Sequence, residues 1–372
     1  MTAAWHSAHV RYYALDKDAL ILDGIRPLLH DLQPVVDRAY LARHWRQGPH
    51  LRVNVRTEPA VWHETVRPRI ERHLGAYLAE HPSTSAMDEA AELPVHRRLA
   101  QLELETGPLT PWFPDNSVQF PPYDARVAVL GNEDVAELVA DFSAAGTELL
   151  IAMLDHARTG AATKELLAID LMLAASHTVA PPLQHAFISY RSHAEGFLFA
   201  SGDPAGTRAR FDAHYREHRA VLTERVRRVV ATLDGRTDAA PVPFVREWAQ
   251  ICRHHVRRAA PLADAGRLFP PTPAPAAGDP QRSTFHALML GSPRYRAEIF
   301  DAAWFHLYRL ALNNTYLQIN RLGLAPHERL RACHIAANAV EDVYGVSAHD
   351  LVSGFVRHSG KGISATLADT AS

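Results

Sequence analysis

Residues 214–218 have the pattern H-x-x-E-H, which occurs in a class of zinc proteases. On a helix, His214 and His218 would share a face and could bind Zn²⁺, with Glu217 as the general base. The other interpretation is a charged amphipathic helix. The sequence offers no evident third ligand, and four nearby arginines would repel a dication: Arg208, Arg210, Arg216 and Arg219. We therefore expect no metal site.

A cysteine and two histidines form a second pattern that could carry chemistry. Cys252 lies shortly before His254 and His255, and a Cys–His pair can form a thiol nucleophile. We favour the other interpretation, a single basic helix face. The sequence contains no G-x-S-x-G, Walker or strand-linked G-x-G-x-x-G pattern, which argues against the common hydrolases, P-loop enzymes and dinucleotide enzymes. Among the lysines, only Lys164 could form a Schiff base, and we expect it on an exposed helix.

Several polar side chains in the second half of the chain are suited to proton transfer. Tyr316 falls in a largely apolar helical stretch, where a buried phenol must find a hydrogen-bond partner. His193 is the best acid–base side chain in its segment, which also contains Ser189 and Ser192. The other interpretations are a core tyrosine with a structural hydrogen bond and a core histidine with satisfied nitrogens.

Two further pairs have a defined spacing. Ser283 and His286 are three residues apart and could share a face of one helical turn, although we favour Ser283 as a simple helix N-cap. Alternation along an expected strand places His50 and Arg52 on one face and Leu51 on the other. That polar face either binds substrate or is a solvated strand face.

Three segments, taken together, resemble a known family. They are Tyr40–Arg56 (YLARHWRQGPHLRVNVR), Phe187–Leu198 (FISYRSHAEGFL) and Asn313–Gly323 (NNTYLQINRLG). In order and spacing they resemble the glutamate-eliminating C-terminal domain of lantibiotic dehydratases and its stand-alone relatives in thiopeptide biosynthesis. The resemblance covers about residues 5–357.

Within the family, the resemblance points to the thiopeptide pyridine synthases. Eliminating domains typically carry a histidine four residues before the asparagine of the third segment, whereas this chain has Tyr316 before Asn320. The H-W-R-x-G-P-H-L-R form at 44–52 is also similar to the pyridine synthases. The resemblance implies a formal aza-[4+2] cycloaddition between two dehydroalanines of a modified precursor peptide. Water and the leader peptide are then lost, which forms the pyridine and closes the macrocycle, and no cofactor or metal is implied.

The resemblance also implies roles for the polar residues above. From their types and context, Tyr316, Ser283, His193 and His286 are the candidates for catalysis of this reaction. The resemblance implies substrate binding by Arg52, His50, Ser189, Ser192 and Asn320. The leader of the precursor is expected to be acidic, and arginines on or beside the early strands could bind its carboxylates: Arg11, Arg43, Arg46 and Arg56. Other enzymes of the same pathway are possible partners.

Two other functions remain open. A glutamate-eliminating enzyme of the same fold would need a base for the α-proton and cations for the leaving glutamate, and Tyr316 in place of histidine weighs against it. A non-catalytic scaffold that binds the leader would need the arginines but not Tyr316, Ser283 or His193.

Composition sets the broad class. The chain has 372 residues, of which 47% are hydrophobic and 22% charged, as in proteins with a real core. Its net charge of −2 argues against a protein that binds DNA or RNA non-specifically. Two cysteines are too few for a disulfide framework or a Cys-rich zinc site. We find neither an apolar run long enough for a membrane span nor a signal pattern at the N-terminus, so we expect a cytoplasmic protein.

Periodicity indicates an α+β fold: a small mixed β-sheet with flanking helices at the N-terminal side, then a larger, mainly helical body. We expect strands at 9–14, 40–44, 50–55 and 125–130. We expect helices at 17–30, 60–80, 133–145, 147–158, 163–177, 205–233, 244–266, 293–322 and 326–344. The α/β portion, with the leader site, would span 1–131, and the helical portion that completes the active-site cleft would span 132–358. Residues 269–280 are expected to form a Pro/Ala-rich surface loop and residues 359–372 a disordered tail.

Overall fold

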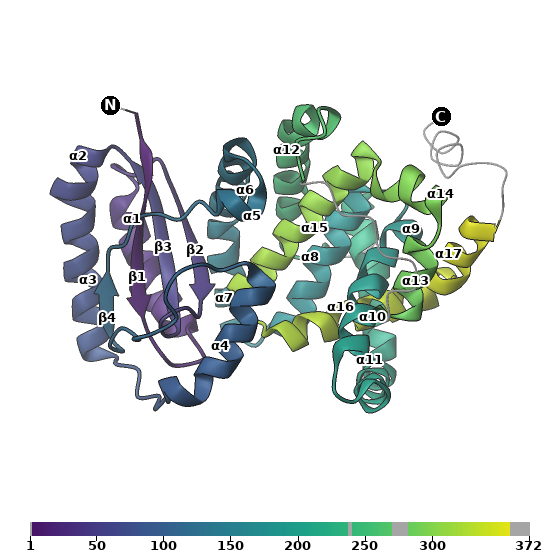
Figure 1. Ribbon diagram of the computed structural model, residues 1–372, viewed down its shortest axis with the longest axis horizontal. Coiled ribbons are helices and arrows are strands. Elements are labelled where there is room, and N and C mark those ends of the chain that lie inside the picture. The colour runs from purple at the N-terminus through teal and green to yellow at the C-terminus, as the bar shows by residue number, and fades with distance from the viewer. Residues whose placement is uncertain (1, 237–239, 270–281, 358–372) are drawn as a thin grey trace. The chain divides into compact units, whose positions relative to one another are not determined.

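The computed structural model describes residues 2–236, 240–269 and 282–357 (Figure 1). The chain divides into two compact units. Unit 1 comprises Met1–Ala161 with Asn320–Gly323, and unit 2 comprises Ala162–Ile319 with Leu324–Ser372. The predicted Pro/Ala-rich loop, after its first residue, and the predicted tail at 359–372 lie outside the described residues.

Unit 1 contains a four-stranded sheet with the order β2-β3-β1-β4 (Figure 1). The strands are β1 (Ala4–Arg11), β2 (Arg38–His44), β3 (His50–Thr57) and β4 (Ser117–Gln119). All three pairings are antiparallel. Our prediction of a mixed sheet is therefore wrong. Gly48, between β2 and β3, has a φ of +96°, and a Cβ there would lie 2.6 Å from the Tyr13 hydroxyl. This turn therefore requires glycine.

Alternation along β3 divides its side chains between two faces, as predicted. Leu51, Val53 and Val55 have no exposed surface and pack into the core of unit 1. The opposite face carries His50 and Arg52, which are only 1% and 7% exposed. The polar face is therefore buried, and the interpretation as a solvated strand face is wrong.

Unit 1 also contains helices. They are α1 (Arg26–Leu32), α2 (Pro59–Val61), α3 (Arg67–Glu80), α4 (Glu89–Glu103), α5 (Val127–Leu130), α6 (Glu133–Ala145) and α7 (Thr147–Arg158), with π-helical turns at Leu20–Ile25 and Trp62–Val66. Helix α3 packs on β1 and β4, whereas α6 and α7 pack on β2. The packing of α3 follows from its sequence, because Ile70, Leu74 and Leu78 recur every four residues and are buried.

Unit 2 is helical. Its helices are α8 (Lys164–Val179), α9 (Leu183–Ala186), α10 (Ile188–Ala200), α11 (Pro204–Leu233), α12 (Val245–Asp264), α13 (Thr284–Leu290), α14 (Pro293–Tyr295), α15 (Ala303–Leu322), α16 (Pro326–Tyr344) and α17 (Ala348–Arg357), with a π-helical turn at Arg296–Phe300. Every residue of α8 from Leu167 to Ser176 is buried, and the helix contacts α11, α12 and α16. A helix that is apolar on all sides belongs in a core, so α8 forms the centre of unit 2.

The predicted α+β class is confirmed, and the predicted helices at 133–145, 147–158 and 326–344 match α6, α7 and α16. The predicted strand at 125–130 is wrong. Arg126 has a positive φ of 53°, and its backbone N–H donates to the Asp124 carboxylate, so the chain turns there and α5 follows. The fourth strand is β4 instead.

The described residues contain no single helix with both the length and the apolar composition needed to cross a membrane. Helix α8 together with residues 183–200 passes that test as a pair, but the pair is bent by 113°.

Candidate active site

Unit 2 contains a pocket of about 720 Å³. Its lining is mainly apolar, and six aromatic side chains contribute to it: Tyr295, Phe300, Trp304, Phe305, Tyr308 and Phe355. Four of the predicted site residues also line it: Ser189, Ser192, His193 and His286. An apolar cavity with a few convergent polar groups is the usual form of a ligand site.

His193, on α10, presents its ring to this pocket. Its Nδ1 lies 2.8 Å from the carbonyl oxygen of Ser189 and 3.2 Å from the hydroxyl oxygen of Tyr316. Because a carbonyl oxygen only accepts, Nδ1 carries the proton, and the neutral ring keeps its lone pair on Nε2. The His193 side chain is exposed in the pocket, but the pocket walls around it desolvate the ring and lower its pKa to about 4, and the positive charge of Arg329 acts in the same direction. The His193 ring is therefore neutral at pH 7.

Tyr316, on α15, lies behind His193 and is 6% exposed. The two rings meet edge to face with centroids 4.9 Å apart, and the Cys333 thiol lies 3.6 Å from the Tyr316 hydroxyl. The phenol thus has the partner that we predicted, and its oxygen is a second acceptor for the Nδ1 proton. Burial raises the pKa of Tyr316 well above its ordinary value. The residue does not itself line the pocket, so it reaches the pocket through His193.

Ser283 caps the N-terminus of α13, where its Oγ accepts the backbone N–H of His286 at 3.3 Å. The same oxygen lies 2.7 Å from His286 Nδ1, and His286 Nε2 lies 3.0 Å from Ser192 Oγ. The cap and the Ser283–His286 contact, which we had set against each other, therefore occur together. Burial lowers the pKa of His286, so its neutral ring has one donor and one acceptor nitrogen between the two serines.

A glycine on α10 allows this arrangement. A Cβ at Gly196 would lie 3.2 Å from Cε1 of His286, which is tighter than an ordinary van der Waals contact. The absence of a side chain therefore lets the His286 ring lie against α10 and reach Ser192.

The predicted substrate residues His50 and Arg52 lie in unit 1, on the buried polar face of the sheet. The His50 ring stacks on His9 at 4.6 Å and lies 5.3 Å from His44. Desolvation lowers the pKa of His9 to about 2 and that of His44 to about 4. Within the described structure, Arg52 Nε and His50 Nε2 are buried without a hydrogen-bond partner. Asn320, near the end of α15, also belongs to unit 1 and is half-buried.

Two of the arginines predicted to bind the leader have structural contacts in unit 1. Arg11 is 2% exposed and donates to the carbonyls of residues 46–48 at 2.9–3.0 Å. Arg43 donates to the carbonyl of Arg321 at 3.0 Å and lies 3.3 Å from Asp18. Arg11 therefore holds the β2–β3 turn, and this placement does not support it as a leader contact.

The other two arginines are more accessible. The side chains of Arg46 and Arg56 are 24% and 29% exposed. Arg46 lies 3.5 Å from Glu105, and Arg56 forms an ion pair with Glu137 at 2.8 Å. Both guanidinium groups already have acidic partners within the chain.

The family model for the C-terminal part of the lantibiotic biosynthesis dehydratases matches residues 5–340. The chain belongs to this family. Among solved structures it is similar to the pyridine synthase TbtD from thiomuracin biosynthesis, with 36% sequence identity and a TM-score of 0.76. That match covers 92% of this chain and 99% of the TbtD chain.

Two further members of this fold show the architecture alone. TsrL matches with 22% identity and a TM-score of 0.69, over 96% of this chain and 100% of its own. The tRNA-dependent lantibiotic dehydratase MibB from Microbispora sp. 107891 matches with 16% identity and a TM-score of 0.50, over 92% of this chain and 28% of its own. A comparison with curated proteins found no match.

In this member of the lantibiotic dehydratase C-terminal family, helix α15 lines the pocket with residues that our sequence analysis missed: Phe305, Tyr308, Arg309, Leu312 and Asn313. They precede Tyr316 by eleven, eight, seven, four and three residues, respectively, so they share its face of the helix. Helical spacing backwards from Tyr316 could have identified them. The Tyr308 hydroxyl is held 2.8 Å from Ser176 Oγ, whereas Arg309 lies over the Phe269 ring, 4.5 Å from its centroid.

The cysteine predicted not to be a nucleophile is fully buried on α12. Burial raises the pKa of the Cys252 thiol far above its ordinary value, so the thiol stays protonated. Its surroundings support a structural role.

Proposed function

We propose that this chain is a thiopeptide pyridine synthase, which joins two dehydroalanines of one modified precursor peptide by a formal aza-[4+2] cycloaddition. The observation that carries the proposal is the 36% identity to the pyridine synthase TbtD over 92% of this chain and 99% of that one. A match along nearly the whole of both chains supports a shared reaction more strongly than a shared domain would. The modified precursor peptide is the proposed substrate.

The proposed reaction balances without an oxidant or reductant. One dehydroalanine, with its preceding amide written as the iminol, is the azadiene, and the second dehydroalanine is the alkene. Two carbon–carbon bonds form. The iminol C–O bond then breaks as water leaves, and a C–N bond breaks as the leader leaves as a carboxamide. These steps need positioning and proton transfer, which a protein can supply with its own side chains.

His193 is the proposed base of the iminol step. Its lowered pKa, about 4, keeps the ring neutral at pH 7, and the hydrogen bond from Nδ1 to Ser189 leaves the lone pair on Nε2. Nε2 would take the proton of the substrate amide and return it during the loss of water. Tyr316 would hold the ring in this orientation, as a positioning residue.

Ser192 is the proposed donor to the substrate carbonyl. A consistent direction of hydrogen bonds runs from Ser283 O–H to His286 Nδ1, and from His286 Nε2–H to Ser192 Oγ. The Ser192 hydroxyl proton is then free to point into the pocket. A donor at the carbonyl oxygen favours the iminol, because negative charge grows on that oxygen as the amide loses its proton.

His50 and Arg52, on the polar face of the sheet in unit 1, are proposed contacts of the substrate backbone, which would reach them only if the groups that cover them move, because they are 1% and 7% exposed. Arg52 Nε is buried without a protein acceptor, which is costly unless another group supplies one. A peptide carbonyl of the substrate would be such an acceptor. We assign Arg52 and His50 to this role, together with Asn320 from the same unit.

The leader is proposed to bind to unit 1 through Arg46 and Arg56, the two more exposed members of the predicted set. Both lie on or beside the β2–β3 hairpin. Acidic leader side chains would exchange with Glu105 and Glu137 as partners of the two guanidinium groups.

The proposal is tested by incubating the protein with a precursor peptide that already bears azoles and dehydroalanines, and following the products by mass spectrometry. A macrocycle that has lost water, together with the free leader carboxamide, supports a pyridine synthase. Release of glutamate from a glutamylated precursor would instead establish an eliminating enzyme. Binding of the precursor without any change in its mass would indicate a non-catalytic scaffold. Release of glutamate, or binding alone, would overturn the proposal.

Ser192 on α10 and Ser201, the residue that caps the C-terminus of α10, provide a matched pair. Ser192→Ala removes the proposed donor and should slow product formation at least tenfold. Ser201→Ala removes a hydroxyl at the end of α10 that bonds to the Leu198 carbonyl at 2.8 Å and does not line the pocket, so turnover should be unchanged. Equal rates for both variants would remove Ser192 from the mechanism.

A further inference from the structure

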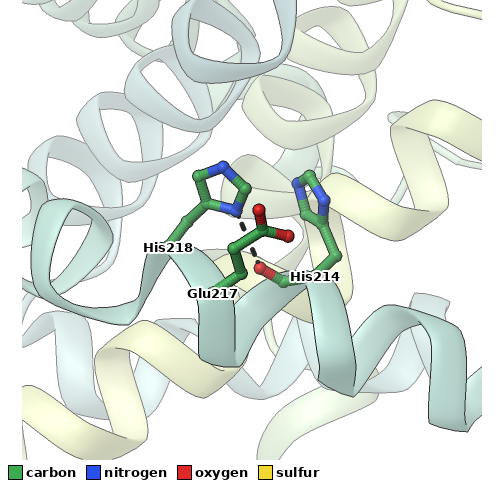
Figure 2. A group of neighbouring side chains, drawn as sticks. All are labelled: His214, Glu217 and His218. Carbon is green, nitrogen blue, oxygen red and sulfur yellow. Dashed lines mark hydrogen bonds between the residues drawn. The ribbon is translucent and has the colours of Figure 1, made fainter.

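A surface cluster on α11 lies outside the pocket and has no role in the proposed reaction. His214, Glu217 and His218 point toward one another from one face of this helix (Figure 2). One possible ligand atom from each residue lies within 4.8 Å of the other two. Two imidazoles and a carboxylate are the donor set that suits Zn²⁺ and its neighbours in the first transition row.

Hydrogen bonds fix the tautomers of both histidines. His218 Nδ1 lies 2.9 Å from the backbone carbonyl of His214, to which it must donate, so its lone pair is on Nε2 (Figure 2). His214 Nε2 lies 3.2 Å from a carboxylate oxygen of Glu165 on α8, which leaves the lone pair on Nδ1. Each ring thus donates through one nitrogen and keeps the other for a cation. A histidine ligand whose second nitrogen donates to a carboxylate or a carbonyl is the arrangement that protein metal sites use.

The arginines that we expected to repel a dication are largely neutralised. Arg208 pairs with Glu195 at 2.6 Å, and Arg219 pairs with Asp342 at 2.6 Å. Arg210, which shares the face of His214, has a longer contact with Asp203, at 3.9 Å. Arg216 is two residues from His214, and residues at that spacing do not face each other on a helix. The electrostatic objection from the sequence therefore loses most of its force.

A second cluster of potential metal ligands is not suited to bind a cation. His44, Glu103 and Glu105 also gather their atoms in unit 1. There, His44 Nδ1 accepts the backbone N–H of Arg46 at 3.1 Å, so Nε2 carries the proton and donates to Glu105 at 3.3 Å. Neither nitrogen of His44 has a free lone pair, and Glu105 is held by ion pairs.

We propose that His214, Glu217 and His218 bind a divalent first-row transition cation such as Zn²⁺, and that Glu165 orients His214 from behind. Donor atoms around a tetrahedral zinc lie about 3.3 Å apart, so the three side chains need only small rotations to close on the ion. Three protein ligands leave one coordination position for water. Through the His214–Glu165 contact, the ion would also tie the middle of α11 to the start of α8.

The test is isothermal titration of the full chain with ZnCl₂, in a buffer that does not bind metal. We expect one saturable site on this surface, at least tenfold weaker in His214→Ala and in His218→Ala. Glu165→Gln should weaken it about tenfold, the effect expected of an outer partner. His349→Ala, which removes an exposed histidine on α17, should leave the affinity unchanged. Far-ultraviolet circular dichroism of each variant checks that α11 still folds.

Two results would overturn this assignment. The first is no saturable zinc binding by the wild-type chain. The second is zinc affinity that is unchanged in folded His214→Ala and His218→Ala variants, which would show that the ion binds elsewhere. The site is independent of the proposed reaction, so failure of the pyridine synthase assay has no bearing on it.

Discussion

Replacement of Tyr316 by phenylalanine separates a proton-transfer role from a positioning role. The substitution removes one oxygen, which lies 3.2 Å from His193 Nδ1 and 3.6 Å from the Cys333 sulfur. The ring stays, so the edge-to-face contact with His193 is kept. His193 also keeps its hydrogen bond to the Ser189 carbonyl at 2.8 Å, so the base stays in place but is held by one acceptor instead of two.

The size of the expected effect follows from that geometry. One hydrogen bond between neutral groups contributes about 0.5–1.5 kcal/mol, which corresponds to roughly a two- to tenfold change in rate. A side chain that itself transfers a proton contributes about 10²–10⁴-fold. Because Tyr316 does not line the pocket, we expect the smaller loss, in kcat with KM unchanged, and a fall in unfolding free energy of about 1 kcal/mol.

The assay is single-turnover product formation, measured by mass spectrometry in a double-mutant cycle with His193→Gln. If Tyr316 acts through His193, Tyr316→Phe should have no further effect once His193 is replaced. Tyr215→Phe is the control, since it removes a buried hydroxyl on α11 that bonds to the Asp342 carboxylate and does not line the pocket. A loss above a hundredfold in Tyr316→Phe, or an undiminished effect in the His193→Gln background, would refute the positioning role.

Three further predictions follow from the same contacts. His193→Gln should lower kcat by about 10²–10⁴-fold while circular dichroism stays unchanged, and near-normal turnover would exclude His193 as the base. Gly196→Ala should displace the His286 ring, whose Cε1 would lie 3.2 Å from the new Cβ, and lower kcat by less than about tenfold with little change in melting temperature. Unfolding free energy should fall between pH 6.5 and pH 4, because His44, with a folded-state pKa of about 4, binds a proton there only when the chain unfolds. This contribution is present above pH 6.5 and amounts to about 3 kcal/mol, so urea titrations of His44→Gln should show a shallower pH dependence over that window.

Local signals in the sequence predicted those parts of the molecule that depend on near neighbours. Apolar spacing predicted α6 and α7 to the residue, and alternation predicted the two faces of β3. The three-residue spacing of Ser283 and His286 allowed the contact that the structure shows, although we favoured the N-cap, which is also present. In each case the residues that form the sequence pattern are also the residues that contact one another in the structure.

Features that depend on tertiary packing could not be predicted in the same way. Strand β4 has only three residues, too few to show alternation, and it is defined by its pairing with β1. Helix α4 contains Pro94, which argues against a helix when the sequence is read alone. The pocket joins α10, α13, α15 and α17, and only packing brings these helices together. The contact between His193 and Tyr316 spans 123 positions of sequence, so no local pattern could indicate it.

The pocket lining carries little charge. Among the described residues that line it, Arg309 is the arginine and Asp350 the aspartate, and burial lowers the pKa of the three lining histidines His185, His193 and His286. The three rings are therefore neutral at pH 7, and Arg309 is the lining cation that could hold an anion. Elimination of glutamate would need positive charge beside the leaving carboxylate, whereas amides and alkenes need only hydrogen-bond donors and acceptors.

Tyr316 also adds no charge near the pocket. A histidine at that position could carry a positive charge, but a tyrosine cannot, and burial raises its pKa so that it does not carry a negative charge either. The group behind His193 is thus a neutral hydroxyl within hydrogen-bonding distance of Nδ1. A neutral hydroxyl at this position keeps a contact with His193 without adding charge, which fits the proposed cycloaddition better than an elimination of glutamate.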